Sequence, residues 1–290
     1  MRLRTFVAAS FIALGSVTAP IAWAETKVAP MEAMQGEAAV LALSETLNIG
    51  PLFDVLHEEG KSYGKALEED MFPGGGGPGW IATVEAIYDT PTLRARFDAA
   101  LVAELSSDPA AVADMVAFFG SDRGQRILKL EIEARRALLD TAVEEAAQVT
   151  ADKMRAARDP RVGLVTRLAE AGDLIEMNVA GALSGNLAFL QGMAHAGIYG
   201  EEVDQDQMMS DVWGQEEQIR ADTTTWLYPF LLLAYEPLSD ADLEGYIKFS
   251  ESVSGRRLNA ALFTAFDAVF KQVSYDLGRA AGRAMQGSDI

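Results

Sequence analysis

Residues 122–149, "DRGQRILKLEIEARRALLDTAVEEAAQV", carry the pattern that decides the fold class. Positions at steps of three and four form one stripe along this stretch, apolar at first and fading at the end: Ile127, Leu130, Ala134, Leu138, Thr141 and Glu145. This spacing is the period of an α-helix with one buried face. The same step recurs later at Leu258, Leu262, Phe266, Val269 and Val273. Because helix formers dominate and no useful length alternates like a strand, we predict an all-α protein.

Further helices are expected over most of the remaining chain, at 37–70, 80–88, 91–105, 110–120, 164–194, 207–235 and 240–250. The segment 72–80, "FPGGGGPGW", contains five Gly and two Pro. It is expected to be a loop, because that composition costs too much backbone entropy inside a helix. The segment 158–163, "RDPRVG", is expected to separate two halves of the chain, since Pro160 ends a helix at or before Asp159.

A short motif at the start of the stripe recurs once. Residues 117–128, "AFFGSDRGQRIL", and 248–259, "KFSESVSGRRLN", share four residue types at the same spacing, namely Phe118, Ser121, Gly124 and Arg126 in the first and Phe249, Ser252, Gly255 and Arg257 in the second. An offset of 131 between 110–137 and 241–268 gives seven identities in 28 positions, against about two expected from composition. We therefore predict two tandem, duplicated helical modules packed together, module 1 at 25–157 and module 2 at 158–290.

The repeated motif has a structural and a functional interpretation. In the structural one, each Ser caps a helix, each Gly lets a neighbouring backbone approach too closely for a Cβ, and each Phe packs over a tight helix–turn–helix corner. The functional alternative is an anion site at the helix N-terminus, with Arg126 and Arg257 supplying positive charge. Acidic neighbours and the single Gly of each copy favour the corner. We then expect each Arg to bridge to a carboxylate on a neighbouring helix.

The chain begins with two Arg, a long apolar run and a small-x-small site at 22–24, which is typical of a secretory signal peptide cut after Ala24. The alternative, an uncleaved membrane anchor, is disfavoured because Gly15, Ser16, Thr18 and Pro20 interrupt the run. Removal of residues 1–24 takes away two Arg and no acid, which changes the net charge from −19 to −21. A mature protein in the periplasm or secreted, and not integral to a membrane, is the expectation.

The charge and the composition exclude several classes of function. So acidic a surface disfavours nucleic acid and anionic membranes as partners, because binding them depends on Lys and Arg. The absence of Cys rules out thiol catalysis and cysteine metal sites. His57 and His195 are the two histidines of the chain, and neither lies in a metal-binding spacing such as "HExxH". We expect no catalytic, cofactor or metal residues.

The stretches "LSSDPAAVADMVAFFGSDRGQRI" (105–127) and "LSDADLEGYIKFSESVSGRRL" (238–258) resemble the core of the exported bacterial family known as domain of unknown function 2059. That family has an acidic helix start, an apolar helix that ends in Phe and an aromatic, and then Ser, two residues, Gly and a basic residue. The first copy fits at Phe118, Phe119, Ser121, Gly124 and Gln125. The second departs at Ser250, where the second aromatic is expected. The resemblance implies a helical, exported protein in two tandem copies, with no known activity.

Three hypotheses of function remain open from the sequence. The leading one is a non-enzymatic helical protein that binds an unknown protein or small-molecule partner in the envelope. The second is a hydrolase or metal-dependent enzyme that uses carboxylates with His57 or His195. The third is a small-molecule binder whose pocket lies between the two modules and is lined by "WLYPFLLLAY" at 226–235.

Overall fold

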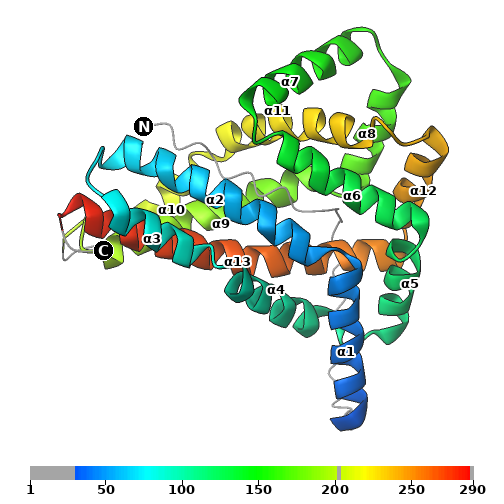
Figure 1. Cartoon of the computed structure of the whole chain (residues 1–290), viewed down its shortest axis with the longest axis horizontal. Coiled ribbons are helices and arrows are strands. Elements are labelled where there is room, and N and C mark those ends of the chain that lie inside the picture. Colours follow the sequence, from blue (N-terminus) through cyan, green and yellow to red (C-terminus); the bar gives the residue numbers. More distant parts are fainter. Residues whose placement is uncertain (1–29, 201–203, 288–290) are drawn as a thin grey trace.

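The computed structural model describes residues 30–200 and 204–287, with the side chains of 30–34 left out, and helices make up almost all of this part (Figure 1). In chain order the helices are α1 (Pro30–Thr46), α2 (Ile49–Met71), α3 (Gly77–Ile87), α4 (Thr90–Leu105), α5 (Pro109–Phe119), α6 (Asp122–Ala137), α7 (Thr141–Ala156), α8 (Pro160–Ala171), α9 (Leu174–His195), α10 (Gln205–Trp213), α11 (Glu216–Tyr235), α12 (Asp240–Ser250) and α13 (Val253–Met285). No strand occurs in these residues, so the all-α prediction is confirmed. The predicted signal peptide, 1–24, lies outside the described residues.

Several helices pack on α13. This helix is 33 residues long and runs along α9, with α4 against it as well (Figure 1). Phe53 of α2, Phe97 of α4 and Phe266 of α13 are buried where these helices meet, with ring centroids 4.7–6.1 Å apart. Helices from 25–157 therefore pack directly on the last helix of the chain. The division into modules at 157 and 158 stays a prediction.

Several helices expected as single long elements are broken in the structure. The segment 122–149 is divided between α6 and α7, because Asp140 leaves the helix and its side chain accepts a hydrogen bond from the Ala142 backbone N–H. The segment 37–70 is divided by Asn48, whose φ of 55° is left-handed. The segment 164–194 is interrupted in the same way at Asp173, with φ 44°, and 207–235 at 214–215. Non-glycine residues in the left-handed region are uncommon, which is why the pattern did not reveal the breaks at Asn48 and Asp173.

The Gly-rich segment is only partly a loop. Its second half, from Gly77, forms the first turn of α3, whereas the expectation was a loop through residue 80. The carboxylate of Glu68 accepts hydrogen bonds from the backbone N–H groups of Gly76 and Gly77, both at 3.2 Å, and thereby satisfies two donors at the start of the helix. The helix end expected before Pro160 is present, since α7 ends at Ala156 and α8 begins at Pro160.

Within the residues that the structure describes, no single helix has both the length and the apolarity to cross a membrane. One pair of helical segments, Gln35–Thr46 and Ile49–Met71, meets that criterion only when taken together, and the two are bent by 59°.

Candidate binding groove

The two copies of the repeated motif form two capped corners, one between α5 and α6 and one between α12 and α13. The Ser121 hydroxyl accepts a hydrogen bond from the Gly124 N–H at 3.1 Å, and the Ser252 hydroxyl accepts one from the Gly255 N–H at 3.0 Å. A Cβ on Gly124 would lie 2.3 Å from the carbonyl oxygen of Phe118, and one on Gly255 would lie 2.0 Å from that of Phe249. The backbone that passes so close is the last turn of the preceding helix, so the glycines permit the corner itself.

The two corners also meet one another. The rings of Phe118 and Phe249 stack with centroids 4.1 Å apart and an angle of 11° between their planes. Arg257 of α13 forms an ion pair at 3.5 Å with Asp108, the residue that caps α5, as expected of a bridge to a carboxylate. Arg126 of α6 departs from that expectation and donates to the Pro237 carbonyl at 2.6 Å.

The carboxylate of Asp242, near the start of α12, pairs with Arg123 at 2.9 Å, so Arg126 is left to bind the backbone carbonyl before this helix. Each motif Arg thus reaches the loop that starts the helix of the other corner. Both side chains are committed to protein partners, which favours the structural interpretation of the motif over an anion site.

A buried carboxyl group lies beside the corners. Glu131 of α6 is 1% exposed, and its Oε1 accepts hydrogen bonds from the hydroxyls of Tyr235 at 2.6 Å and Tyr246 at 3.1 Å. Burial raises the pKa of the Glu131 carboxyl to about 8, although the two hydrogen bonds act in the opposite direction. Its Oε2 has no hydrogen-bond partner among the described residues. The group is enclosed in the core, and we assign it to stability.

The two histidines are far apart in chain position and each has a single close polar partner. His57 Nδ1 lies 2.9 Å from the Tyr88 carbonyl oxygen, and His195 Nδ1 lies 2.9 Å from the Tyr275 hydroxyl. In the described ranges, no three His, Asp or Glu side chains form a group that could hold a metal ion. Neither histidine is joined to a constellation that would carry out hydrolysis.

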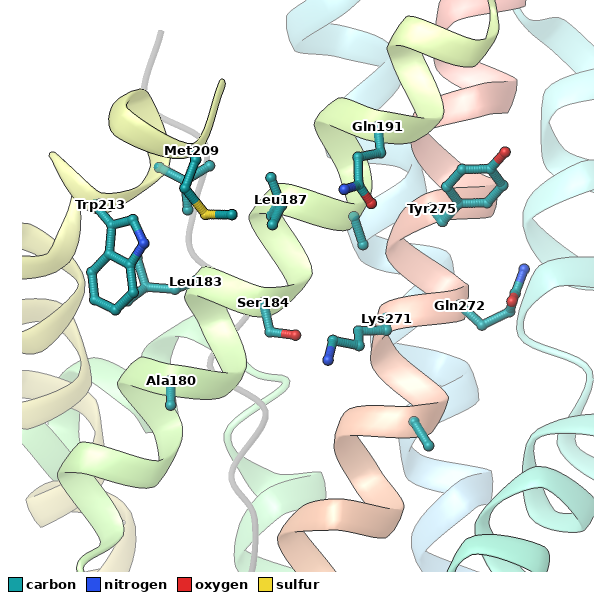
Figure 2. Close-up of a pocket in the computed structure, with 13 residues that line it drawn as sticks. Ala180, Leu183, Ser184, Leu187, Gln191, Met209, Trp213, Lys271, Gln272 and Tyr275 are labelled. Atoms are coloured by element: carbon teal, nitrogen blue, oxygen red, sulfur yellow. The ribbon is translucent and has the colours of Figure 1, made fainter. Parts of the chain in front are cut away.

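A groove between α9, α10 and α13 is the most distinctive cavity. Its larger chamber has a volume of about 620 Å³ and is walled mainly by aliphatic side chains. The lining consists of Ala180, Leu183, Ser184, Leu187, Ala188 and Gln191 of α9, Met209, Val212 and Trp213 of α10, and Ala268, Lys271, Gln272 and Tyr275 of α13. Figure 2 shows Trp213 and Met209 on the α10 side, facing the α9 residues Leu183 and Leu187. Trp213 is 57% exposed and Met209 44% exposed, which is unusual for large apolar side chains.

A smaller chamber of about 370 Å³ continues the groove between the earlier parts of α9 and α13. The two chambers share Ala180, Ser184 and Lys271, so these three residues mark the junction between them. In Figure 2 the polar ends of Ser184 and Lys271 face each other across the gap between α9 and α13. We call the position of Ser184 and Lys271 the polar junction.

Two polar atoms in the groove are buried without a partner in the described part of the chain. They are Oγ of Ser184, at the polar junction, and Oδ1 of Asn178, which lines the smaller chamber. Asn178 is 3% exposed, and its amide N–H bonds to the Leu174 carbonyl at 2.7 Å. Lys271 pairs with Asp267 at 2.9 Å. Unpartnered buried polar groups are costly, so a ligand that uncovers and binds them would be favoured.

Close backbone contact fixes the two helices that form the groove. A Cβ on Gly192 of α9 would lie 2.1 Å from the Tyr275 carbonyl oxygen, and one on Gly278 of α13 would lie 2.1 Å from that of Phe189. Glycine at these positions lets the helices touch, which makes the groove a preformed feature of the fold.

Sequence reasoning missed this groove. The run 226–235 forms the second half of α11 and is largely buried in the core, whereas the groove is built by α9, α10 and α13. All of its lining residues fall within 158–290, so this groove does not lie between the two expected modules.

Comparison with known proteins gives one family. Residues 92–153, from α4 to α7, match the family described as "Uncharacterized protein conserved in bacteria (DUF2059)". The match covers a single copy and includes the first motif, so two tandem copies remain a prediction. No curated protein and no solved structure matches the chain. The groove lies outside the matched residues.

Proposed function

We propose that this protein is an exported, non-enzymatic binding protein that holds an elongated and mainly apolar molecule in the groove of α9, α10 and α13. The observation that carries the proposal is a preformed apolar groove with unpartnered polar atoms inside it. Its larger chamber, at about 620 Å³, falls in the range of small-molecule sites in proteins, which are apolar with a few convergent polar groups.

Export to the periplasm or medium is part of the proposal and rests on the signal-peptide pattern of residues 1–24. An exported carrier of apolar molecules needs an acidic, well-solvated exterior and a sheltered apolar interior surface. The net charge of −19 and the mainly apolar lining of the groove fit this division of roles.

The test is direct binding of an environment-sensitive apolar dye to the purified protein. Ala180 is exposed and lines both chambers, so Ala180→Trp fills the groove at its junction without replacing a core residue. Ala146→Trp, on an exposed position of α7, is the matched control. We expect Ala180→Trp to weaken dye binding at least about tenfold and the control to bind as the wild type does. Equal binding by a folded Ala180→Trp protein would contradict the proposal.

A further inference from the structure

The two chambers lie end to end along the seam of α9 and α13. The smaller one begins at Met177 of α9 and the larger one ends at Gln191. These residues are fourteen positions apart, which spans about 21 Å at the rise of an α-helix. The residues along α13 follow the same order, from Phe263 to Tyr275. The groove is therefore long and narrow, as required for a chain-like molecule.

The polar junction lies near the middle of that length. Ser184 is seven residues from Met177 and seven from Gln191, so the groove extends about 10 Å in each direction along the helix. An amphiphile with its polar group at one end leaves either the junction or one of the chambers without a complementary partner. A molecule with its polar group near the middle matches both chambers and the junction at once.

Hydrogen bonding defines what that central group must do. The Ser184 hydroxyl is shielded from solvent without a partner in the described residues, and it can donate. The Lys271 ammonium has three donors, and it forms an ion pair with Asp267 at 2.9 Å. The two groups face each other (Figure 2). A hydrogen-bond acceptor that enters the junction and uncovers the Ser184 hydroxyl can receive from both.

Charge decides between a neutral acceptor and an anion. The ammonium charge of Lys271 is already balanced by Asp267, and both residues line the smaller chamber. The chain as a whole carries −19. An anionic group at the junction would have to compete with the Asp267 carboxylate and enter the field of an acidic protein. A neutral carbonyl takes the same hydrogen bonds without that cost.

From these features we infer that the ligand has two apolar arms joined by a neutral hydrogen-bond acceptor, the carbonyl of an acyl ester or amide, held by Ser184 and Lys271. This inference rests on the proposed function, because it specifies the occupant of the same groove. The longer arm fills the chamber of about 620 Å³ and the shorter arm that of about 370 Å³.

The experiment compares three compounds of equal chain length as competitors of the apolar dye. They are an ester with its carbonyl near the middle, the unbranched fatty acid and the hydrocarbon. We expect the ester to displace the dye at a concentration about tenfold lower than either of the others, as one to two satisfied hydrogen bonds would provide. Comparison of the ester with the fatty acid shows the effect of charge. Comparison of the ester with the hydrocarbon shows the effect of the acceptor.

Two variants connect that preference to the junction. Ser184→Ala and Lys271→Met should each reduce the advantage of the ester over the hydrocarbon by about threefold to tenfold, a ratio that is measured against the dye affinity of each variant. Ser210→Ala on an exposed position of α10 and Lys129→Met, which removes a similar i,i+4 ion pair on α6, are the matched controls.

The outcomes separate this inference from the proposed function. If the dye binds in the groove but all three compounds compete equally, or if the fatty acid competes best, the neutral central acceptor is wrong and the groove stands. If Ser184→Ala and Lys271→Met leave the ester preference intact, the junction is not its source and the inference is overturned. Failure of the dye to bind, or indifference of its binding to Ala180→Trp, would instead overturn the proposed function.

Discussion

The paired corners and the α9–α13 groove both depend on glycines that bring backbones into contact, but they differ in how their polar groups are satisfied. At the corners the Ser hydroxyls cap helices and the Arg side chains bind Pro237 and Asp108. In the groove Ser184 Oγ and Asn178 Oδ1 are buried without partners in the described residues. The capping Ser and paired Arg side chains of the corners serve the fold, whereas unpartnered buried groups on residues that line a cavity are suited to bind something else.

The largest expected effect tests the corner as a structural device. Gly255→Leu places side-chain atoms where a Cβ alone would be 2.0 Å from the Phe249 carbonyl oxygen. We expect a loss of about 3 kcal/mol in the free energy of unfolding, which lowers the melting temperature by roughly 6–12 °C. Gly124→Leu should act in the same direction.

The matched control for that substitution is Gly163→Leu in α8, where an added Cβ meets no atom within 4 Å. Thermal unfolding followed by circular dichroism compares the variants. Helix propensity alone favours Leu over Gly, so we expect no fall for Gly163→Leu. A melting temperature that falls equally for Gly163→Leu and Gly255→Leu would show that the close contact at the corner is not responsible.

A second effect concerns the carboxyl group beside the corners. The pKa of Glu131 is raised from 4.5 to about 8 by burial, so between these values the folded protein holds a proton that the unfolded chain has lost. The contribution of Glu131 to the free energy of unfolding is therefore largest below pH 4.5. It falls by up to about 1.4 kcal/mol per pH unit as the pH rises toward 8.

Glu131→Gln should remove this slope, since an uncharged amide can still accept from the hydroxyls of Tyr235 and Tyr246. Urea unfolding at several pH values between 5 and 8 is the measurement, with Glu133→Gln, exposed on the same helix, as the control. A wild-type slope that survives in Glu131→Gln would assign the pH dependence to other groups.

The smallest predicted effect is the interaction energy between the two corners. Phe118→Leu and Phe249→Leu, combined in a double-mutant cycle, should give a coupling energy of about 0.5–1.5 kcal/mol for the stacked rings. Phe118→Leu with Phe72→Leu is the comparison, since Phe72 packs on Trp80 near the start of α3, away from the corners (Figure 1). A coupling energy as large between Phe118 and Phe72 would show that the stacked rings are not its source.

The comparison also shows what a sequence can reveal. The helix class, the Ser caps and the tight Gly positions are local properties, so the spacing of residues was sufficient to predict them. The breaks at Asn48 and Asp173 were missed because their left-handed backbone is imposed by tertiary packing on residues that do not require it. The groove was missed because its walls come from α9, α10 and α13, and no single stretch contains its pattern.

The particular residues of the groove gave little signal. Leu183 and Leu187 have ordinary helical spacing, and Ser184 and Asn178 look like solvent-facing polar positions. Only the packing of α13 on α9 makes these two residues part of the lining of a cavity. Glu131 is a similar case, since it lies four residues after Ile127 and thus on the buried face of α6.

The central claim is that binding and folding are carried by separate regions, and one paired measurement tests it most directly. Dye affinity and melting temperature are determined for Ala180→Trp in the groove and for Gly255→Leu at a corner, at a temperature where both are folded. We predict that Ala180→Trp loses affinity at least about tenfold with little change in melting temperature, and that Gly255→Leu does the reverse. Undiminished dye affinity in Ala180→Trp, or a loss of affinity in folded Gly255→Leu as large as that in Ala180→Trp, would contradict the account.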